Sequence, residues 1–175
     1  MTRRNGELSS MSKVEIRSAT RLDLEEIWDQ NIQDHLGDER WVSWKAQFIS
    51  DNESGKAKTF VITNDGTTIG EATLLFSSEC KAVQGRSFLA DNESVANINA
   101  LRIQKAYEGL GHVSKLISFM EAYIKEEGYQ RLTIGVEAKE SRNLAIYLHW
   151  GYDIHLGSSI EDDELILYYA KDLGT

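Results

Sequence analysis

The sequence contains no proline and a single cysteine, Cys80, among its 175 residues. One cysteine cannot form a disulfide within the chain, and such a composition is typical of a reducing compartment. A chain of this length buries about 70% of its unfolded surface, so its core needs neither a disulfide nor a metal. The length also favours one domain, because domains run to roughly 100–200 residues.

Long apolar runs are missing as well. No stretch approaches the roughly 18 apolar residues of a membrane span, and the first ten residues are polar, unlike a signal peptide. We therefore expect a cytoplasmic protein that binds no membrane. Acidic residues outnumber basic ones by 28 to 19, for a net charge of −9, which argues against nucleic-acid binding. This charge keeps many proteins soluble, and it only weakly favours a cationic acceptor such as a polyamine or an aminoglycoside.

Apolar periodicity predicts alternating strands and helices. Thr20 or Asp23 is suited to cap the first helix, and Asn64-Asp65-Gly66 is typical of a hairpin turn. Polar residues 51–55 and 77–93 indicate loops. The predicted strands are residues 13–18, 59–63, 68–76, 95–103, 131–137, 152–158 and 164–171, and the predicted helices are one ending at Gly37 and residues 41–50, 112–127 and 142–150.

The order of these elements predicts the fold class. The strand–helix–strand run over residues 95–137 implies a right-handed parallel crossover. Hairpins on either side of it imply a mixed sheet with helices on both faces. We expect residues 13–175 to form a single domain behind a flexible tail of residues 1–12.

Residues 107–117 carry the most specific local signal. They read Tyr-Glu-Gly-Leu-Gly-His-Val-Ser-Lys-Leu-Ile and join a predicted strand to a predicted helix. The first turn of a helix offers unpaired N–H groups and partial positive charge, and glycine lets a phosphate approach closely. No Gly-Lys-Ser/Thr follows, and Ser114 stands where a dinucleotide fingerprint needs glycine. The segment therefore predicts either an anion site of another kind or merely a tight turn.

Residues 97–152 resemble the GNAT superfamily of acetyl-CoA-dependent N-acetyltransferases. Glu108–Val113 follows the family pattern Gln/Arg-x-x-Gly-x-Gly/Ala, with Glu108 and Val113 as departures, and Ser114–Ile117 continues it. Residues 146–152, Ile-Tyr-Leu-His-Trp-Gly-Tyr, are similar to the later family motif Leu-Tyr-x-x-x-Gly-Phe.

The resemblance implies an α/β (α+β) fold. The expected sheet is mixed and mostly antiparallel, with a central parallel strand pair and helices on both faces. It implies acetyl transfer from acetyl-CoA, as co-substrate and without a metal, to a primary amine of a small molecule or protein. Homodimers are common in the family. The implied cofactor-binding residues are Leu101, Arg102 and Ile103 for the pantetheine arm and thioester, and Glu108, Gly109, Leu110, Gly111, His112, Val113 and Ser114 for the pyrophosphate.

Five side chains are candidates for catalysis or acceptor binding. Tyr147 matches the family's general-acid tyrosine, and a phenol with a pKa near 10 can protonate a leaving thiolate. Glu71 is a candidate general base. Trp28, Asn97 and Asn99 are candidates for the acceptor pocket. Each also has a plain alternative: core packing for the two aromatic residues, solvent exposure for Glu71, and satisfaction of backbone groups for the asparagines.

Other reactive side chains lack the partners that chemistry requires. His112 and His149 have no metal-ligand spacing with another donor, so we expect solvated or helix-capping roles for both. Cys80 has no recognisable activating partner. Because Glu108 and Val113 depart from the family pattern, a non-catalytic acyl-CoA sensor or interaction domain of the same fold is the alternative to an enzyme.

Overall fold

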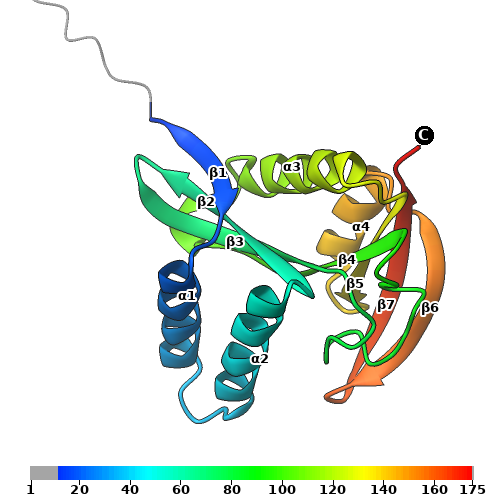
Figure 1. The fold of residues 1–175 in the computed structure, drawn as a ribbon, viewed down its shortest axis with the longest axis horizontal. Coiled ribbons are helices and arrows are strands. Elements are labelled where there is room, and N and C mark those ends of the chain that lie inside the picture. Colours follow the sequence, from blue (N-terminus) through cyan, green and yellow to red (C-terminus); the bar gives the residue numbers. More distant parts are fainter. Residues whose placement is uncertain (1–11, 175) are drawn as a thin grey trace, which may run out of the picture.

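The computed structural model describes residues 12–174, so the predicted tail lies outside the described residues except for Ser12. Seven strands form one sheet in the order β1-β2-β3-β4-β5-β7-β6, flanked by four α-helices (Figure 1). The elements are β1 (Val14–Ser18), α1 (Arg21–Asp34), α2 (Arg40–Ser54), β2 (Ala57–Asn64), β3 (Thr67–Leu75), β4 (Val95–Ile103), the 3₁₀ turn η1 (Lys105–Tyr107), α3 (His112–Glu126), β5 (Arg131–Glu137), α4 (Ser141–His149), β6 (Ile154–Glu161) and β7 (Glu164–Asp172).

The predicted fold class is confirmed. β4 and β5 form the parallel pair, and all other neighbouring strands are antiparallel. Figure 1 shows α1 and α2 on one face of the sheet and α3 and α4 on the other. Each face has its own buried cluster, one around the apolar stripe of α3 and one around Trp28 and Phe48. None of the described helices is long and apolar enough to span a bilayer.

Local signals in the sequence explain several element boundaries. Thr20 caps α1 in a reciprocal capping box with Asp23, so both candidate capping residues take part. Asp65 and Gly66 adopt positive φ values of 50° and 83° in the β2–β3 turn, as the Asn-Asp-Gly sequence predicts. These contacts fix the entry to the helical layer and the register of the first hairpin.

The end of α2 corrects a prediction, because residues 51–54 are helical rather than a loop. The reason is a set of tertiary hydrogen bonds from Asn52. Its Nδ2 donates to the Phe48 carbonyl and to Thr59 Oγ1, and its Oδ1 accepts from the Thr59 amide at 2.8 Å. These contacts join the last turn of α2 to β2, and Gly55 ends the helix in the left-handed conformation at φ 78°.

A β-bulge in β4 determines which side chains face the α1–α2 layer. Asn99 pairs with Thr73 and Arg102 pairs with Glu71, so Ala100 and Leu101 together lie opposite a single β3 residue. Ala100 has a φ of 49°, which is uncommon for a residue other than glycine. Because directly paired residues point to the same face, Asn99 and Arg102 share a face although they are three residues apart.

Candidate active site

The central parallel pair opens into a fork. β4 and β5 are paired from Val95 and Arg131 only as far as Ile98 and Ile134. Beyond that point β4 continues along β3, while β5 continues along β7. The backbone groups of β4 beyond Ile98 that face β5 therefore lack a strand partner. Such groups can hold an extended ligand by hydrogen bonds, as an added strand would.

The glycine turn lies at the start of α3 and provides a row of free amides. Gly109 and Gly111 have φ values of 75° and 83°, and nothing lies within 4 Å of where a Cβ would stand on either. Within residues 12–174, no N–H of residues 109–114 donates to a protein acceptor; the next amide, of Lys115, donates to the Gly111 carbonyl. Together with the helix dipole, these amides form an open anion site. The fork and the turn therefore fit the pantetheine arm and the pyrophosphate of acetyl-CoA.

The residues that depart from the family pattern do not block this turn. Glu108 is exposed, and Val113 packs against the core on the α3 face. Leu110, between the two glycines, is 62% exposed. The prediction of a solvated or capping His112 is wrong, because His112 is buried and its Nδ1 has no partner among the described residues. It lies four residues before the buried Leu116, so helical periodicity already placed it on the inner stripe.

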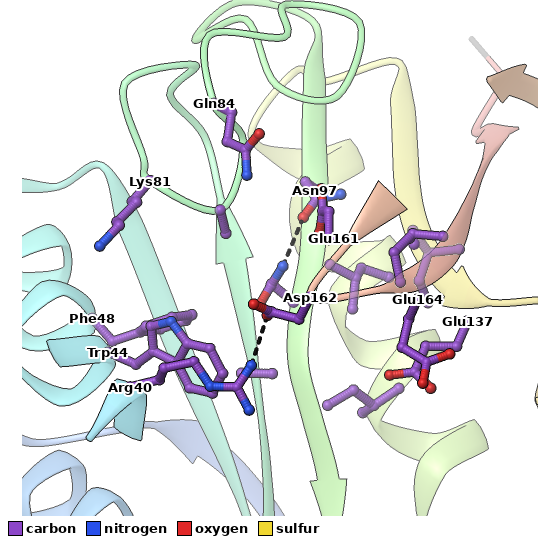
Figure 2. Close-up of a pocket in the computed structure, with 18 of the residues that line it drawn as sticks. Arg40, Trp44, Phe48, Lys81, Gln84, Asn97, Glu137, Glu161, Asp162 and Glu164 are labelled. Carbon is purple, nitrogen blue, oxygen red and sulfur yellow. Dashed lines mark hydrogen bonds and ion pairs between the residues drawn. The ribbon is translucent and has the colours of Figure 1, made fainter. Parts of the chain in front are cut away.

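A cleft of about 1060 Å³ opens where β4 and β5 separate (Figure 2). One wall carries aromatic side chains of α1 and α2, and the opposite wall comes from the end of β5 and the β6–β7 hairpin. The lining residues that bear on function are Trp28, Trp41, Trp44, Asn97, Asn99, Leu101, Arg102, Glu137, Tyr147, Glu161, Asp162 and Glu164. The cleft thus brings together the fork and most of the predicted catalytic and acceptor residues.

Tyr147 lies on α4 and reaches the cleft from the α3–α4 face. Its ring packs against the core and lies 6.2 Å from that of Trp150. The hydroxyl makes no hydrogen bond to any residue of the described chain. Burial raises the pKa of Tyr147 above its usual value of 10. The phenol is therefore protonated at neutral pH and has a proton available for a group in the cleft.

Glu71 lies behind Arg102 and is not a cleft-lining residue. Its side chain is only 10% exposed, and Arg102 Nε donates to its Oε1 at 2.6 Å. Burial raises the pKa of Glu71, while Arg102 opposes that shift. Its predicted role as general base stays a prediction.

The other acceptor candidates line the cleft but are also held by the protein. Trp28 is 3% exposed, and its ring centroid lies 4.9 Å from that of Phe48. Asn97 donates to Thr133 Oγ1 at 3.0 Å and accepts a 3.5 Å contact from Asn99 Nδ2. These asparagines therefore stiffen the base of the fork, and their predicted role in acceptor binding stays a prediction.

The acidic side of the cleft was not predicted. Glu137, Glu161, Asp162 and Glu164 all line it, and Figure 2 shows their side chains on the wall that faces α2. Asp162 forms a 2.9 Å ion pair across the cleft with Arg40 of α2. Residues 161–164, Glu-Asp-Asp-Glu, are visibly acidic in the sequence. That local pattern does not indicate that the β6–β7 turn comes close to α2.

The described part of the chain contains neither a metal-binding cluster nor an activated cysteine. Residues 12–174 contain no group of three or more His, Cys, Asp or Glu side chains arranged to hold a metal ion. Cys80 is buried, and burial raises the pKa of its thiol to about 11. The forked cleft is therefore the best-supported place for chemistry.

A sheet with a central fork, next to a helix that begins in a glycine turn, is suited to hold an extended ligand that ends in an anionic group. The acetyltransferase (GNAT) family model matches residues 17–152, most of the chain. The chain belongs to the GNAT acetyltransferase family. No curated protein sequence matches it.

Several solved structures share the fold at low sequence identity. The Escherichia coli ribosomal-protein-S18-alanine N-acetyltransferase has a TM-score of 0.69 at 15% identity, covering 93% of this chain and 96% of its own. A spermidine N-acetyltransferase chimera, derived in part from Vibrio cholerae, has a TM-score of 0.69 at 13% identity, covering 91% and 95%. An N-acetyltransferase from Thermoplasma acidophilum in complex with coenzyme A has a TM-score of 0.61 at 17% identity, covering 91% and 99%. At these identities the likeness supports the fold alone.

Proposed function

We propose that this chain transfers an acetyl group from acetyl-CoA to a primary amine bound in the forked cleft. One observation carries the proposal: the unpaired end of β4 and Tyr147 line the same cleft, and the free amides of residues 109–114 begin the helix that follows β4 in the chain. Backbone groups make the β4 end and the row of amides, so the departures at Glu108 and Val113 leave them intact. Family membership supports the same reaction class.

The chemistry sets three demands on the chain's own residues. When bound, acetyl-CoA supplies a thioester whose carbonyl carbon is attacked by a neutral amine. The β4 backbone beyond Ile98 would orient the acyl arm and provide donors toward the carbonyl oxygen. Tyr147 would hold a proton at its hydroxyl for the departing sulfur. The amine must also lose a proton, for which Glu71 and a water chain through the cleft remain the candidates.

The alternative function is an acyl-CoA sensor that binds without turnover. Tyr147 favours the enzyme, because the residue lines the cleft and its hydroxyl makes no hydrogen bond to any described residue. A sensor would bind acetyl-CoA and release no thiol with any amine. Thiol release that depends on an added amine would exclude it.

The test is a thermal shift with acetyl-CoA followed by a thiol-release screen over amines. A ligand at 100 times its dissociation constant stabilises the folded state by about 2.7 kcal/mol. We expect clear stabilisation at millimolar acetyl-CoA. Stabilisation by S-acetylpantetheine, which lacks the pyrophosphate, should be weaker. The absence of any shift at millimolar acetyl-CoA would overturn the proposal.

A further inference from the structure

Arg102 occupies the acceptor side of the cleft because of the β4 bulge. The register places it on the α1–α2 face, with Asn97 and Asn99, while Leu101 and Ile103 pack on the α3 face. Its side chain is 30% exposed and lines the cleft. A cation therefore lies beside the position at which an acceptor must approach the fork.

The aromatic wall of the cleft is already in contact with cations of the chain itself. The Arg102 guanidinium lies 4.9 Å from the Trp28 ring centroid and 5.4 Å from that of Trp41. Arg40 lies 5.6 Å from the Trp44 ring. Aromatic faces attract cationic ligands when those faces are free. Here Arg102 and Arg40 occupy them, so this wall is poorly suited to hold a polyamine.

Two nitrogens of the Arg102 guanidinium, Nη1 and Nη2, make no hydrogen bond to any residue of the described chain. Glu71 binds only Nε, and Nη2 is buried without a hydrogen-bond partner among the described residues. Burying a charged donor without an acceptor is costly, and native structures rarely leave one in that state. The paired N–H groups of a guanidinium match the two oxygens of a carboxylate. A carboxylate that binds Arg102 from the cleft would supply the acceptors that Nη1 and Nη2 lack.

The opposite wall has the reverse charge. Glu137 and Glu164 share Lys139, Glu161 pairs with Arg86, and Asp162 pairs with Arg40, so this wall has four carboxylates against three cations. Across the cleft, Arg102 offers positive charge to one end of a ligand, and Glu137 and Glu164, which share a single lysine, offer excess negative charge to the other. A ligand with a carboxylate and an amine fits this polarity, whereas a polycation would meet Arg102.

We propose that the acceptor is a small amino carboxylate, of the amino-acid class, whose carboxylate is bound by Arg102. This assignment rests on the proposed acetyl transfer and adds the substrate class. Arg102 acts here as a specificity-determining residue, in addition to any backbone contact with the acyl arm. An amino carboxylate differs from the purely cationic acceptor that the net charge alone weakly favours.

The test compares free amino acids with their amides in the thiol-release assay. Converting the carboxylate to an amide lowers the pKa of the amine, so intrinsic reactivity favours the amide. We expect the best amino acid to exceed its amide at least tenfold in kcat/KM. Removing only Arg102 would leave Glu71 buried and unpaired, so the informative variant is the double substitution Arg102→Gln with Glu71→Gln. It should reduce the acid-to-amide ratio at least tenfold, whereas Arg40→Gln, the control at the other cleft arginine, should keep it.

A second measurement needs no turnover. Trp28 and Trp41 touch Arg102, so binding of the amino acid without acetyl-CoA should change tryptophan fluorescence, and the double variant should lose that response. Preference for amides or polyamines, or an acid-to-amide ratio that survives in the double variant, would overturn the assignment while leaving acetyl transfer intact. Failure to bind acetyl-CoA, with the fluorescence response retained, would instead overturn the proposed reaction. Absence of both signals would overturn both proposals.

Discussion

The two halves of the cleft are built in different ways. The cofactor half comes from one continuous segment, residues 95–137, and uses mainly backbone groups at the fork and the glycine turn. The acceptor half uses side chains from α1, α2, β4, the end of β5 and the β6–β7 hairpin. Backbone sites tolerate side-chain variation, and sites made of side chains do not. This difference explains why the chain keeps the family fold although its glycine turn departs from the family pattern. It also explains why the acceptor has to be inferred from the side chains of the other half.

The largest effect should come from Tyr147→Phe, which removes the proposed general acid next to the cofactor half of the cleft. We expect kcat to fall at least tenfold, because general acid catalysis contributes about 10²–10⁴-fold, while the dissociation constant of acetyl-CoA stays unchanged. Burial raises the pKa of Tyr147 above 10, so ionisation would remove its proton only above pH 10. The rate ratio of wild type to variant should therefore be constant from about pH 6 to 9.

Steady-state kinetics and circular dichroism would check this prediction. Tyr169→Phe is the matched control, because Tyr169 also packs against the α3-face core but does not line the cleft. Equal turnover in the Tyr147 variant and the wild type would remove the residue from the mechanism.

The next effect tests the backbone half directly. Gly111→Ala places a side chain at a φ of 83°, at a cost of about 1–2 kcal/mol. Relief of that strain would turn the free amides away, so we expect acetyl-CoA to bind about tenfold more weakly. Gly55→Ala is the control, because Gly55 has a φ of 78° and equally open surroundings at the far end of α2. It should lower the free energy of unfolding by a similar amount and keep the affinity for acetyl-CoA, as measured by calorimetry.

Glu71→Gln separates positioning from base catalysis in the side-chain half. If Glu71 only positions Arg102, the acceptor KM should rise about threefold to tenfold, since one hydrogen bond contributes about 0.5–1.5 kcal/mol. The affinity for acetyl-CoA should not change. A fall in kcat beyond tenfold, with loss of the acidic limb of the pH profile, would instead identify Glu71 as the base.

The smallest effect is expected at the ion pair that crosses the cleft. Arg40 and Asp162 have side chains that are 52% and 63% exposed, and such surface pairs contribute little. Arg40→Gln should change the acceptor KM by no more than about twofold, since solvent and salt screen the pair. Asp162→Asn should behave alike. A larger change that disappears at high salt would mean that the pair gates the cleft.

The strands and helices could be predicted well from the sequence, because short-range signals determine them. Strands 95–103 and 131–137 were placed at their observed bounds, and the glycine turn was located from its spacing. Asn52 was misplaced in a loop because its hydrogen bonds reach another element. The solvated or capping role predicted for His112 is wrong, because that prediction considered its polar side chain and not its position on the apolar stripe.

The acceptor half was harder to predict because its partners are far apart in the chain. Nothing local joins Trp28 to Arg102 or Arg40 to Asp162. One local signal is nevertheless present in the sequence. Polar and apolar residues alternate from Asn97 to Ala100 and then slip at Leu101, and that slip marks the bulge that turns Arg102 toward the tryptophans.

The bulge at Ala100 also has a genetic consequence. Loss of that single codon in frame would restore regular alternation in β4 and leave Asn99 and Arg102 two residues apart, which keeps both side chains on the same face. Arg102 would still point toward the tryptophans and Ile103 toward α3, and only the bulge itself would be lost. Loss of this codon should thus alter acceptor choice less than a single substitution of Arg102, while leaving the glycine turn as it is.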